Sequence, residues 1–464
     1  VFGVDRSPMG AEIATLSLWL ASFVPGLSLA YLDRNVVVGN SLIGVANPDI
    51  VIREGTFQAD SLQTALEKGA EAVARLADID DITPSEVKAS RVADLEARHA
   101  TKGLQRLFDL WTAEGFGLAG ARSHAETHGP EVIAGANSHS RQNLVQNASD
   151  LGSTHAFLHW PTSFPRVFFR DNPGFDVVVG NPPWKKVRIK DVNYYAMYRP
   201  GLVGLSARER SSMISELVRE RPELQSQLSQ EKDRLETERK ALKFGEYEGM
   251  SGDPDLYKYF CQRYKSLVRK SGYFGVVLPR TSLVNEGSEG FRKWLYGVMA
   301  TRRIDTLRNH GRWIFDAEPR YGIALIVAEH HIPETDHRIV VSGMATSSDE
   351  WERQKNSAGT TIDPLFLPQG QITPQLRSDS EKTLFDKLRA GSPFPLGPNE
   401  LWLCFPVREL DEDTDKHLWK EANSGRPLWK GTSFDQYSPH GSKARICPTN
   451  DEVWRRVKKT LPGE

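Results

Sequence analysis

The chain has few cysteines and no long apolar run. Its 464 residues include only three cysteines, Cys261, Cys404 and Cys447, which lie far apart and show no metal-ligand spacing. We therefore expect neither a disulfide framework nor a zinc site, and a reducing, cytoplasmic environment fits this pattern. No stretch of 18 apolar residues occurs, so the sequence predicts no transmembrane helix and no membrane partner.

An excess of charge of either sign is also missing. The formal net charge is −1, with 26% charged and 39% hydrophobic residues, which is ordinary for a globular protein. The chain as a whole therefore does not predict a polyanionic partner, and any nucleic-acid surface has to be a local patch. The length predicts two or three domains.

An initiator methionine and a signal peptide are absent, and we expect a fragment that begins inside a domain. The first residues form a short apolar strand that ends in Asp5. Ser7 and Pro8 then predict a helix start, and the helix runs to about Phe23. A strand, an acid and a helix form the second half of a nucleotide-binding unit, where the acid typically holds ribose hydroxyls. The alternative for Asp5 is a helix-capping or solvent-facing carboxylate.

Two further strands end in polar residues. The apolar run at 36–38 leads into Gly39, and Asn40 and Ser41 follow at its carboxyl end. The run at 175–180 reads as a buried parallel strand. It is followed by Asn181-Pro182-Pro183-Trp184. Because ligands of open α/β sheets bind at the carboxyl ends of strands, both segments are candidate sites.

The second of these segments suits chemistry on an amine. The nitrogen of an adenine amine is a poor nucleophile, because its lone pair is delocalised into the ring. The side-chain oxygen of Asn181 and the carbonyl of Pro182 could accept hydrogen bonds from its two N–H groups, and the adjacent Pro183 would stiffen the loop. Trp184 offers a flat face on which a flipped base could stack. The alternative is an ordinary proline turn after a strand.

The remaining segments frame these sites. We expect amphipathic helices at 57–118, a long loop at 119–153, and a helical hairpin at 205–243. The four histidines in and next to the loop, His124, His128, His139 and His155, match no metal pattern. The hairpin reads first as a solvated insertion and second as a DNA-touching arm. A strand is expected at 273–279, and two short strands at 313–315 and 321–328 predict an antiparallel edge hairpin. The segment 346–400 reads as a linker. Aromatic and basic residues alternate from 401 to 464, which suits a nucleic-acid surface.

Several motifs in this order resemble the gamma class of N6-adenine DNA methyltransferases, especially type IIG restriction–modification and phage-defence methylases. The segments that carry the resemblance are Pro8–Leu20, Gly39–Gly44, Asn181–Trp184, Asp255–Tyr257, the strand from Gly272, and Pro427–Gly431. It implies an α/β, Rossmann-like, mostly parallel sheet in a core at 1–345. Helical insertions at about 56–150 and 190–250 and the start of a target-recognition domain at 401–464 complete the organisation.

The resemblance also implies a function and its residues. S-adenosyl-L-methionine is the expected cofactor, double-stranded DNA the expected partner, and restriction or defence-system subunits remain open as further partners. Asp5, Asn40 and Ser41 are the implied cofactor-binding residues. Residues 181–184 are the implied catalytic loop, with Trp184 and Phe315 stacking on the target base and Tyr321 in reserve.

One departure from the family keeps alternatives open. The family's glycine-rich cofactor loop would precede Val1, so we expect the fragment to bind cofactor poorly. We expect no nuclease module within residues 1–464, and whether the parent protein also carries a nuclease stays open. Glutamine-N5 methylation of a protein uses the same Asn-Pro-Pro-aromatic loop, although such enzymes are usually compact. Cytosine-N4 methylation more often has Ser in the first loop position. A non-catalytic DNA-recognition subunit with a degenerate cofactor site is the third alternative.

Overall fold

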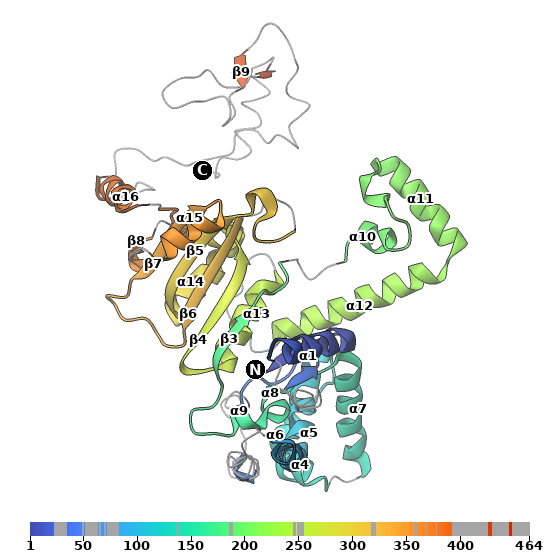
Figure 1. The fold of residues 1–464 in the computed structure, drawn as a ribbon. Helices are drawn as coiled ribbons and strands as arrows, with labels where there is room; N and C mark the ends of the chain where they lie inside the picture. The colour runs from blue at the N-terminus through green and yellow to red at the C-terminus, as the bar shows by residue number, and fades with distance from the viewer. Residues whose placement is uncertain are drawn as a thin grey trace, which may run out of the picture. The chain divides into compact units, whose positions relative to one another are not determined.

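The computed structural model divides the chain into two units, Val1–Thr383 and Leu384–Glu464 (Figure 1). No helix in the described part is long and apolar enough to cross a membrane. Among those residues no group of His, Cys, Asp or Glu could hold a metal ion. The structure describes residues 1–22, 35–48, 51, 64, 66–68, 71, 83–136, 139–184, 189–244, 247, 255–316, 322–356, 360–367, 369–376, 378–391, 426–428 and 445–447.

The first strands form a short parallel pair. Strand β1 (Gly3–Asp5) pairs with β2 (Val36–Val38), and helix α1 (Pro8–Ser22) begins where the sequence predicts. The Ser7 hydroxyl accepts the Gly10 N–H at 3.3 Å, as expected of an N-cap. The apolar side chains on α1 are largely exposed, so this helix contributes little to the core. They are Met9, Ile13, Leu16 and Leu20.

The segment 119–153, expected as a loop, is helical instead. Its alanines, leucines and valines pack at helical spacing against the hydrophobic face of α5 in one buried cluster, while the polar residues that suggested a loop mostly cover the other side. Pro130 is accommodated by a kink, since His128 has non-helical dihedral angles. The elements here are α4 (Pro84–Ala100), α5 (Lys102–Ala113), η2 (Glu114–Phe116), α6 (Ala121–Ala134) and α7 (His139–His155).

A six-stranded mixed sheet forms the second half of the first unit. Its order is β3-β4-β6-β5-β7-β8. Strands β3, β4, β5 and β7 run in one direction, and β6 and β8 run in the other. The expected α/β class with a mostly parallel sheet is therefore confirmed. The strands are β3 (Phe175–Gly180), β4 (Val268–Pro279), β5 (Ala300–Arg308), β6 (Gly322–Glu329), β7 (Ile339–Ala345) and β8 (Thr360–Ile362).

Strand β3 is parallel to β4, as predicted, but it is not buried. Val177 is 58% exposed and Val179 is 77% exposed. Val177 and Val179 are two residues apart and so share one face of β3, which the described residues leave uncovered, whereas Val178 on the other face is half-buried. Among the described strands β3 pairs only with β4. The apolar sequence of β3 therefore does not by itself predict that both faces of the strand are buried.

The predicted antiparallel hairpin exists, but its first strand was placed wrongly. Strand β5 pairs with β6, and residues 313–315 lie in the loop after the helical turn η6 (His310–Arg312). Charged residues in β5 hid it from sequence analysis. Arg302 is paired with Glu329 of β6 at 2.6 Å, a partner that is distant in sequence. Strand β6 lies inside the sheet, and antiparallel β8 lies at its edge.

The expected helical hairpin carries its own small core. Leu202, Leu217, Leu224 and Leu228 are buried there with Tyr195. A sharp break at the predicted position separates its two long helices. These elements are α10 (Asp191–Ala196), η3 (Leu202–Gly204), α11 (Ala207–Glu220) and α12 (Glu223–Phe244).

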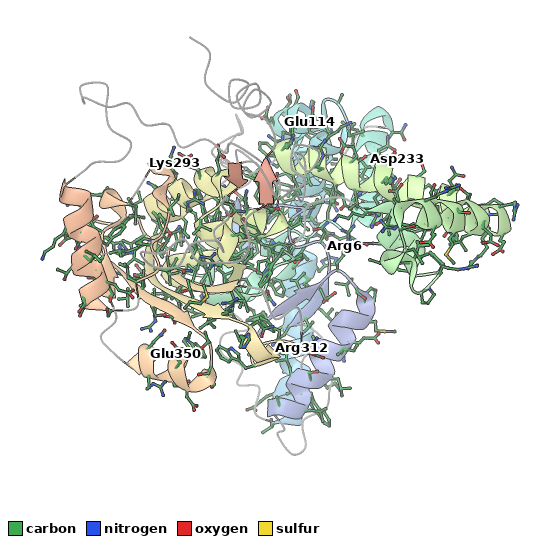
Figure 2. The ribbon with its side chains drawn as sticks, turned by 90° about the horizontal axis from the view of Figure 1, so that it is seen from above. Arg6, Glu114, Asp233, Lys293, Arg312 and Glu350 are labelled. Atoms are coloured by element: carbon green, nitrogen blue, oxygen red, sulfur yellow. The ribbon has the colours of Figure 1, made fainter. Side chains whose placement is uncertain are left out.

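Helix α12 also contacts the start of the chain. The buried carboxylate of Glu238 forms an ion pair with Arg6 at 2.6 Å (Figure 2, where Arg6 is labelled). Arg6 directly follows Asp5, so the insertion is anchored beside a candidate site residue. Further helices of the first unit are α8 (Trp160–Ser163), α9 (Pro165–Phe168), α13 (Leu256–Leu267), η4 (Arg280–Leu283), η5 (Glu286–Ser288) and α14 (Glu289–Val298).

The segment expected as a linker adds structure to the first unit as far as Thr383. Arg292 donates to the carbonyl of Gly370 at 2.8 Å, and this contact holds the segment against α14. Its elements besides β8 are α15 (Ser348–Asn356), η7 (Pro364–Phe366), η8 (Gln369–Gln371) and α16 (Asp379–Gly391). As functional domains, the predicted boundaries stay predictions.

Most of the predicted recognition domain, 401–464, lies outside the described residues. Only an antiparallel pair is described there, β9 (Arg426–Leu428) with β10 (Arg445–Cys447). The aromatic and basic tail residues therefore keep the status of a sequence prediction.

Candidate functional site

Asp5 lies at the carboxyl end of β1, against the first turn of α1. One carboxylate oxygen, Oδ1, accepts the Ser7 N–H at 2.7 Å. A Cβ at Gly10 would lie only 2.6 Å from the Asp5 carboxyl carbon, so the glycine makes room for the carboxylate. The second oxygen, Oδ2, forms no hydrogen bond with any residue that the structure describes. Asp5 thus fixes the residue that caps the helix, while its second oxygen has no partner among the described residues.

Asn40 and Ser41 lie beside Asp5. The N–H of Gly39, the residue before Asn40, donates to the Asp5 carbonyl at 2.9 Å. The Asn40 side-chain oxygen accepts the Leu42 N–H at 3.2 Å, which closes a tight turn. The Ser41 carbonyl accepts from the Trp160 indole at 3.3 Å. The structure therefore brings all three predicted cofactor-binding residues together.

The backbone after Ser41 is paired along one edge. The carbonyls of Ile43 and Val45 accept the N–H groups of Leu158 and Trp160 at 2.8 and 3.0 Å. Gly44 between them has φ +123°, and a Cβ there would lie 2.2 Å from the Leu158 oxygen. This approach requires glycine. We call residues 39–46 the cofactor loop, after the cofactor-binding role that the sequence predicts for Asn40 and Ser41.

A buried histidine supports the cofactor loop, and sequence analysis missed this role. His159 accepts the Val45 N–H at its Nδ1 (3.1 Å). Its Nε2 therefore carries the proton and donates to Asp109 at 2.9 Å. His159 and Asp109 are only 3% and 6% exposed. The only sequence signal was a lone His and a lone Asp 50 residues apart.

The candidate catalytic loop leaves the end of β3. Pro182 is buried, whereas Asn181 and Pro183 are exposed. Neither the Asn181 side chain nor the Pro182 carbonyl forms a hydrogen bond with a residue in the described ranges. Among the described residues, neither predicted acceptor has a donor that would compete with a ligand.

Trp184 and Phe315 pack against the same apolar cluster. Both are half-buried and contact the group of Leu307, Ile323 and Ala345. The Trp184 indole also donates to the Val277 carbonyl at 3.2 Å. The structure thus brings the two predicted base-stacking aromatics to one place, while Tyr321 lies outside the described residues.

Asn309 fixes Phe315, and sequence analysis did not single it out. Asn309 directly follows β5 and is fully buried. Its Nδ2 donates to the Phe315 carbonyl at 2.9 Å, and its Oδ1 accepts the N–H groups of Ile314 and Phe315 at 3.1 and 3.2 Å. One side chain therefore replaces the strand pairing that the sequence predicted for 313–315.

We expect Asn309→Ala to loosen Phe315 and to destabilise the fold by about 1–3 kcal/mol, because three backbone groups lose their partner. Thermal unfolding measures the loss of stability. Binding to DNA with 2-aminopurine at the target position measures base capture, which should weaken. The exposed Asn193→Ala on α10 is the matched control and should change neither reading. Unchanged base capture in Asn309→Ala would contradict the positioning role.

Two arginines flank the cluster that holds Phe315. Arg308 pairs in register with Gly322. The Arg280 side chain packs so close to Gly322 that a Cβ there would lie within 3.2 Å of it. Neither arginine forms an ion pair with a carboxylate in the described part of the chain. Within the described residues, both cations thus lack an acidic partner at the strand ends around Gly322. Sequence analysis missed them because single arginines carry no motif.

Comparison with solved structures gives only low similarity. The type IIG restriction endonuclease BpuSI is 13% identical, with 82% of this chain and 49% of that chain covered and a TM-score of 0.26. A nuclease-deletion mutant of the type ISP enzyme LlaGI is 11% identical, covering 82% and 43%, with a TM-score of 0.27. A type I methyltransferase subunit from Streptococcus thermophilus is 15% identical, covering 53% and 39%, with a TM-score of 0.22.

The chain spans less than half the length of each of these three proteins, and scores this low carry no argument about function. No curated protein matches it. The model of one protein family does match, over residues 1–201 and 225–315, which is more than half of the chain. The chain belongs to the Eco57I restriction-modification methylase family.

Proposed function

We propose that this protein transfers a methyl group from S-adenosyl-L-methionine to the N6 amine of a flipped adenine in DNA, within a restriction–modification or phage-defence system. The observation that carries the proposal is the end of β3. Two acceptors without partners in the described residues, the Asn181 side chain and the Pro182 carbonyl, precede an aromatic residue that packs beside Phe315. Family membership supports the methylase reaction.

The residues around Asp5 fit the cofactor. Oδ1 of Asp5 is fixed by the helix start, so Oδ2 is held in one orientation, as needed to accept from a ribose hydroxyl. The tight turn at Asn40 gives the adjoining loop a single backbone path. Asp5, Asn40 and Ser41 would hold the adenosyl part. The bound cofactor supplies an electrophilic methyl group on its sulfonium.

The catalytic loop acts on the amine. Asn181 Oδ1 and the Pro182 carbonyl accept one N–H each, which favours the electron-rich, pyramidal nitrogen that attacks the methyl group. Proline at 182 and 183 fixes the backbone and so keeps these acceptors in place without reorganisation. Trp184 and Phe315 hold the ring by stacking, which compensates for the stacking energy lost when the base leaves the duplex.

DNA is the proposed partner, and its phosphates give Arg280 and Arg308 a role. Both cations lie at strand ends beside Phe315, where the backbone next to a flipped base would pass. The target sequence would be read elsewhere, and we assign this to residues 401–464 on the sequence pattern alone. Restriction or defence-system subunits are further proposed partners.

Transfer of tritium from labelled S-adenosyl-L-methionine tests the proposal. The full-length protein should label duplex DNA on N6 of adenine, as identified by nucleoside chromatography. Label on cytosine N4 or on a glutamine side chain would refute it. DNA binding without any transfer or cofactor binding would favour the non-catalytic alternative.

A further inference from the structure

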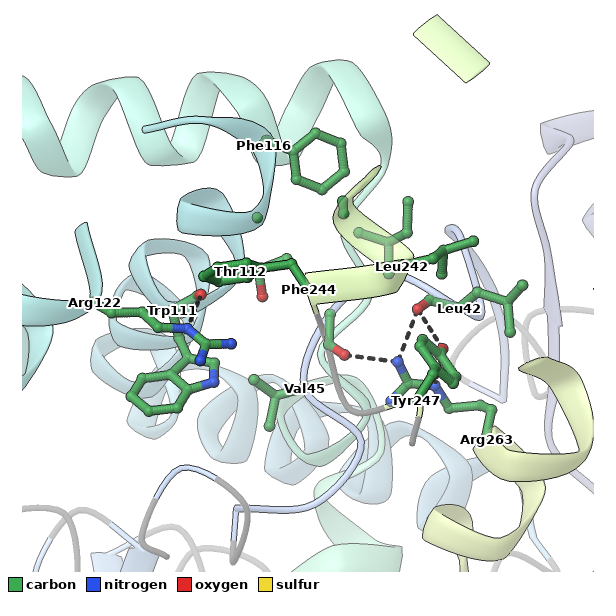
Figure 3. Close-up of a pocket in the computed structure, with 14 residues that line it drawn as sticks. Leu42, Val45, Trp111, Thr112, Phe116, Arg122, Leu242, Phe244, Tyr247 and Arg263 are labelled. Atoms are coloured by element: carbon green, nitrogen blue, oxygen red, sulfur yellow. Dashed lines mark hydrogen bonds between the residues drawn. The ribbon is translucent and has the colours of Figure 1, made fainter. Parts of the chain in front are cut away.

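The cofactor loop has a second edge, and its carbonyls accept hydrogen bonds from an arginine of helix α13. While Ile43 and Val45 direct their carbonyls to one side, Leu42 and Gly44 direct theirs to the other. A single guanidinium nitrogen of Arg263 donates to both, at 2.8 Å to Leu42 and 3.0 Å to Gly44 (Figure 3). Arg263 thus takes the place of a neighbouring strand along this edge.

Tyr247 completes the contact. Its hydroxyl donates to the Leu42 carbonyl at 2.6 Å and accepts from Arg263 Nε at 3.1 Å. The Leu42 oxygen, with two lone pairs, therefore has two donors. Tyr247 follows α12, whose residues Leu242 and Phe244 line the same cavity of about 40 Å³ behind the loop (Figure 3).

The contact between Arg263 and the cofactor loop is buried. Arg263 is only 2% exposed, and its helix, α13, also positions the buried side chains of Tyr257 and Cys261. A guanidinium in such surroundings keeps its charge and strengthens each hydrogen bond to a carbonyl. Its loss would leave the Leu42 and Gly44 carbonyls with fewer donors in a place that water does not readily reach.

We propose that Arg263 and Tyr247 are positioning residues that set cofactor affinity from behind the cofactor loop. Their hydrogen bonds reach the loop just after Asn40 and Ser41: Arg263 holds the carbonyls of Leu42 and Gly44, and Tyr247 holds that of Leu42. The inference rests on the proposed function, because it assumes that this loop binds S-adenosyl-L-methionine. The proposal adds two residues to the cofactor site. Through Tyr247 it also couples the helical insertion to that site.

The test uses Arg263→Met, Arg263→Lys and Tyr247→Phe in the full-length protein. Calorimetric titration with S-adenosyl-L-methionine gives the Kd and the stoichiometry separately, so unfolded protein lowers only the stoichiometry. We expect Arg263→Met to weaken binding about tenfold, which corresponds to about 1.4 kcal/mol. Arg263→Lys should recover part of that, and Tyr247→Phe should show the smallest change. DNA affinity should stay unchanged.

Arg106→Met is the matched control. This arginine also donates to two carbonyls, those of Val132 and Ile133, but it holds α6 rather than the cofactor loop. Its cofactor Kd should stay unchanged, although both Arg→Met variants lose stability.

Hydrogen–deuterium exchange without cofactor separates this inference from the proposed function. Amides of residues 39–46 should exchange faster in Arg263→Met and Tyr247→Phe than in the unchanged protein and Arg106→Met. Unchanged exchange, or faster exchange with an unchanged Kd, would overturn the inference. Failure of the unchanged protein to bind S-adenosyl-L-methionine would instead overturn the proposed function. If Arg263→Met does not fold, Arg263→Lys and Tyr247→Phe still decide the outcome.

Discussion

Asn181→Ala is expected to reduce the rate of methyl transfer by about 10²–10³ at saturating substrates, the loss typical of one preorganised electrostatic contact to a transition state. The fold should not suffer, because Asn181 is exposed and forms no hydrogen bond within the described ranges. DNA affinity should stay within about twofold, because the contact strengthens only as the amine becomes pyramidal. Single-turnover kinetics, DNA binding and thermal unfolding measure these three quantities.

Asn181→Asp tests whether the side-chain oxygen of Asn181, rather than its amide N–H₂ group, is what supports methyl transfer. Aspartate keeps an oxygen at the same distance from the backbone but loses the amide N–H₂ group. If the side-chain oxygen is what matters, Asn181→Asp keeps more activity than Asn181→Ala. Equal loss in both variants would contradict the acceptor role, and equal loss of rate and DNA affinity in Asn181→Ala would assign the residue to binding.

The candidate site could be predicted from sequence wherever its residues follow a recognisable strand. Asp5, Asn40 and Asn181 each follow a short run rich in β-branched residues, and such runs predict strands without tertiary information. The proximity of Asp5 and Asn40 could then be expected, because they lie at the carboxyl ends of the parallel strands β1 and β2. Asn181 follows β3, which belongs to the separate six-stranded sheet. This reasoning gave the cofactor loop and the catalytic loop, although their roles remain predictions.

The supporting residues could not be predicted, because their partners are distant in sequence. Arg263 lies 221 residues after Leu42, and only the fold brings its guanidinium to that carbonyl. Asn309 was hidden because β5 was not recognised. The strand contains Arg302, Arg303 and Asp305, and their charges are satisfied by one another and by β6, β7 and α15. Tertiary contacts thus override the local pattern.

The exposed valines of β3 show the opposite failure. A run of valines predicts burial only if other parts of the fold cover both faces of the sheet. Val177 and Val179 share one face of β3, and the described residues leave this face open although the strand itself was predicted correctly. Local composition predicts the strand, but only the fold decides which of its side chains are covered.

Gly180→Ala is expected to impair both folding and catalysis, because Gly180 is the last residue of β3 and directly precedes Asn181. A Cβ at this position would lie 2.1 Å from the Tyr264 hydroxyl oxygen and 2.8 Å from Cζ of that ring. The ring cannot move away freely, since it lies between Phe260 and Phe274 with centroids 6.0 and 6.3 Å away. Burial also raises the pKa of the Tyr264 phenol, so it stays neutral.

The strand end or the ring must therefore shift. Overpacking of this kind costs about 1–3 kcal/mol of stability. A displacement of Asn181 by about 1 Å would lower the transfer rate by up to about 10². The backbone itself allows alanine at 180, since its φ is not in the left-handed region. Thermal unfolding and single-turnover transfer measure the two losses.

Tyr264→Leu should partly rescue Gly180→Ala if the clash with the Tyr264 ring is the cause of the losses. Leucine lacks the hydroxyl, Cζ and Cε2 atoms that approach the new methyl group, so Gly180→Ala should cost less in the Tyr264→Leu background than alone. Gly297→Ala in α14 is the matched control, because a Cβ there meets nothing within 4 Å. Additive losses in the double variant would mean that the two residues do not contact each other. A positive coupling in stability and in rate would show that close packing of α13 against the end of β3 aims Asn181 at the amine.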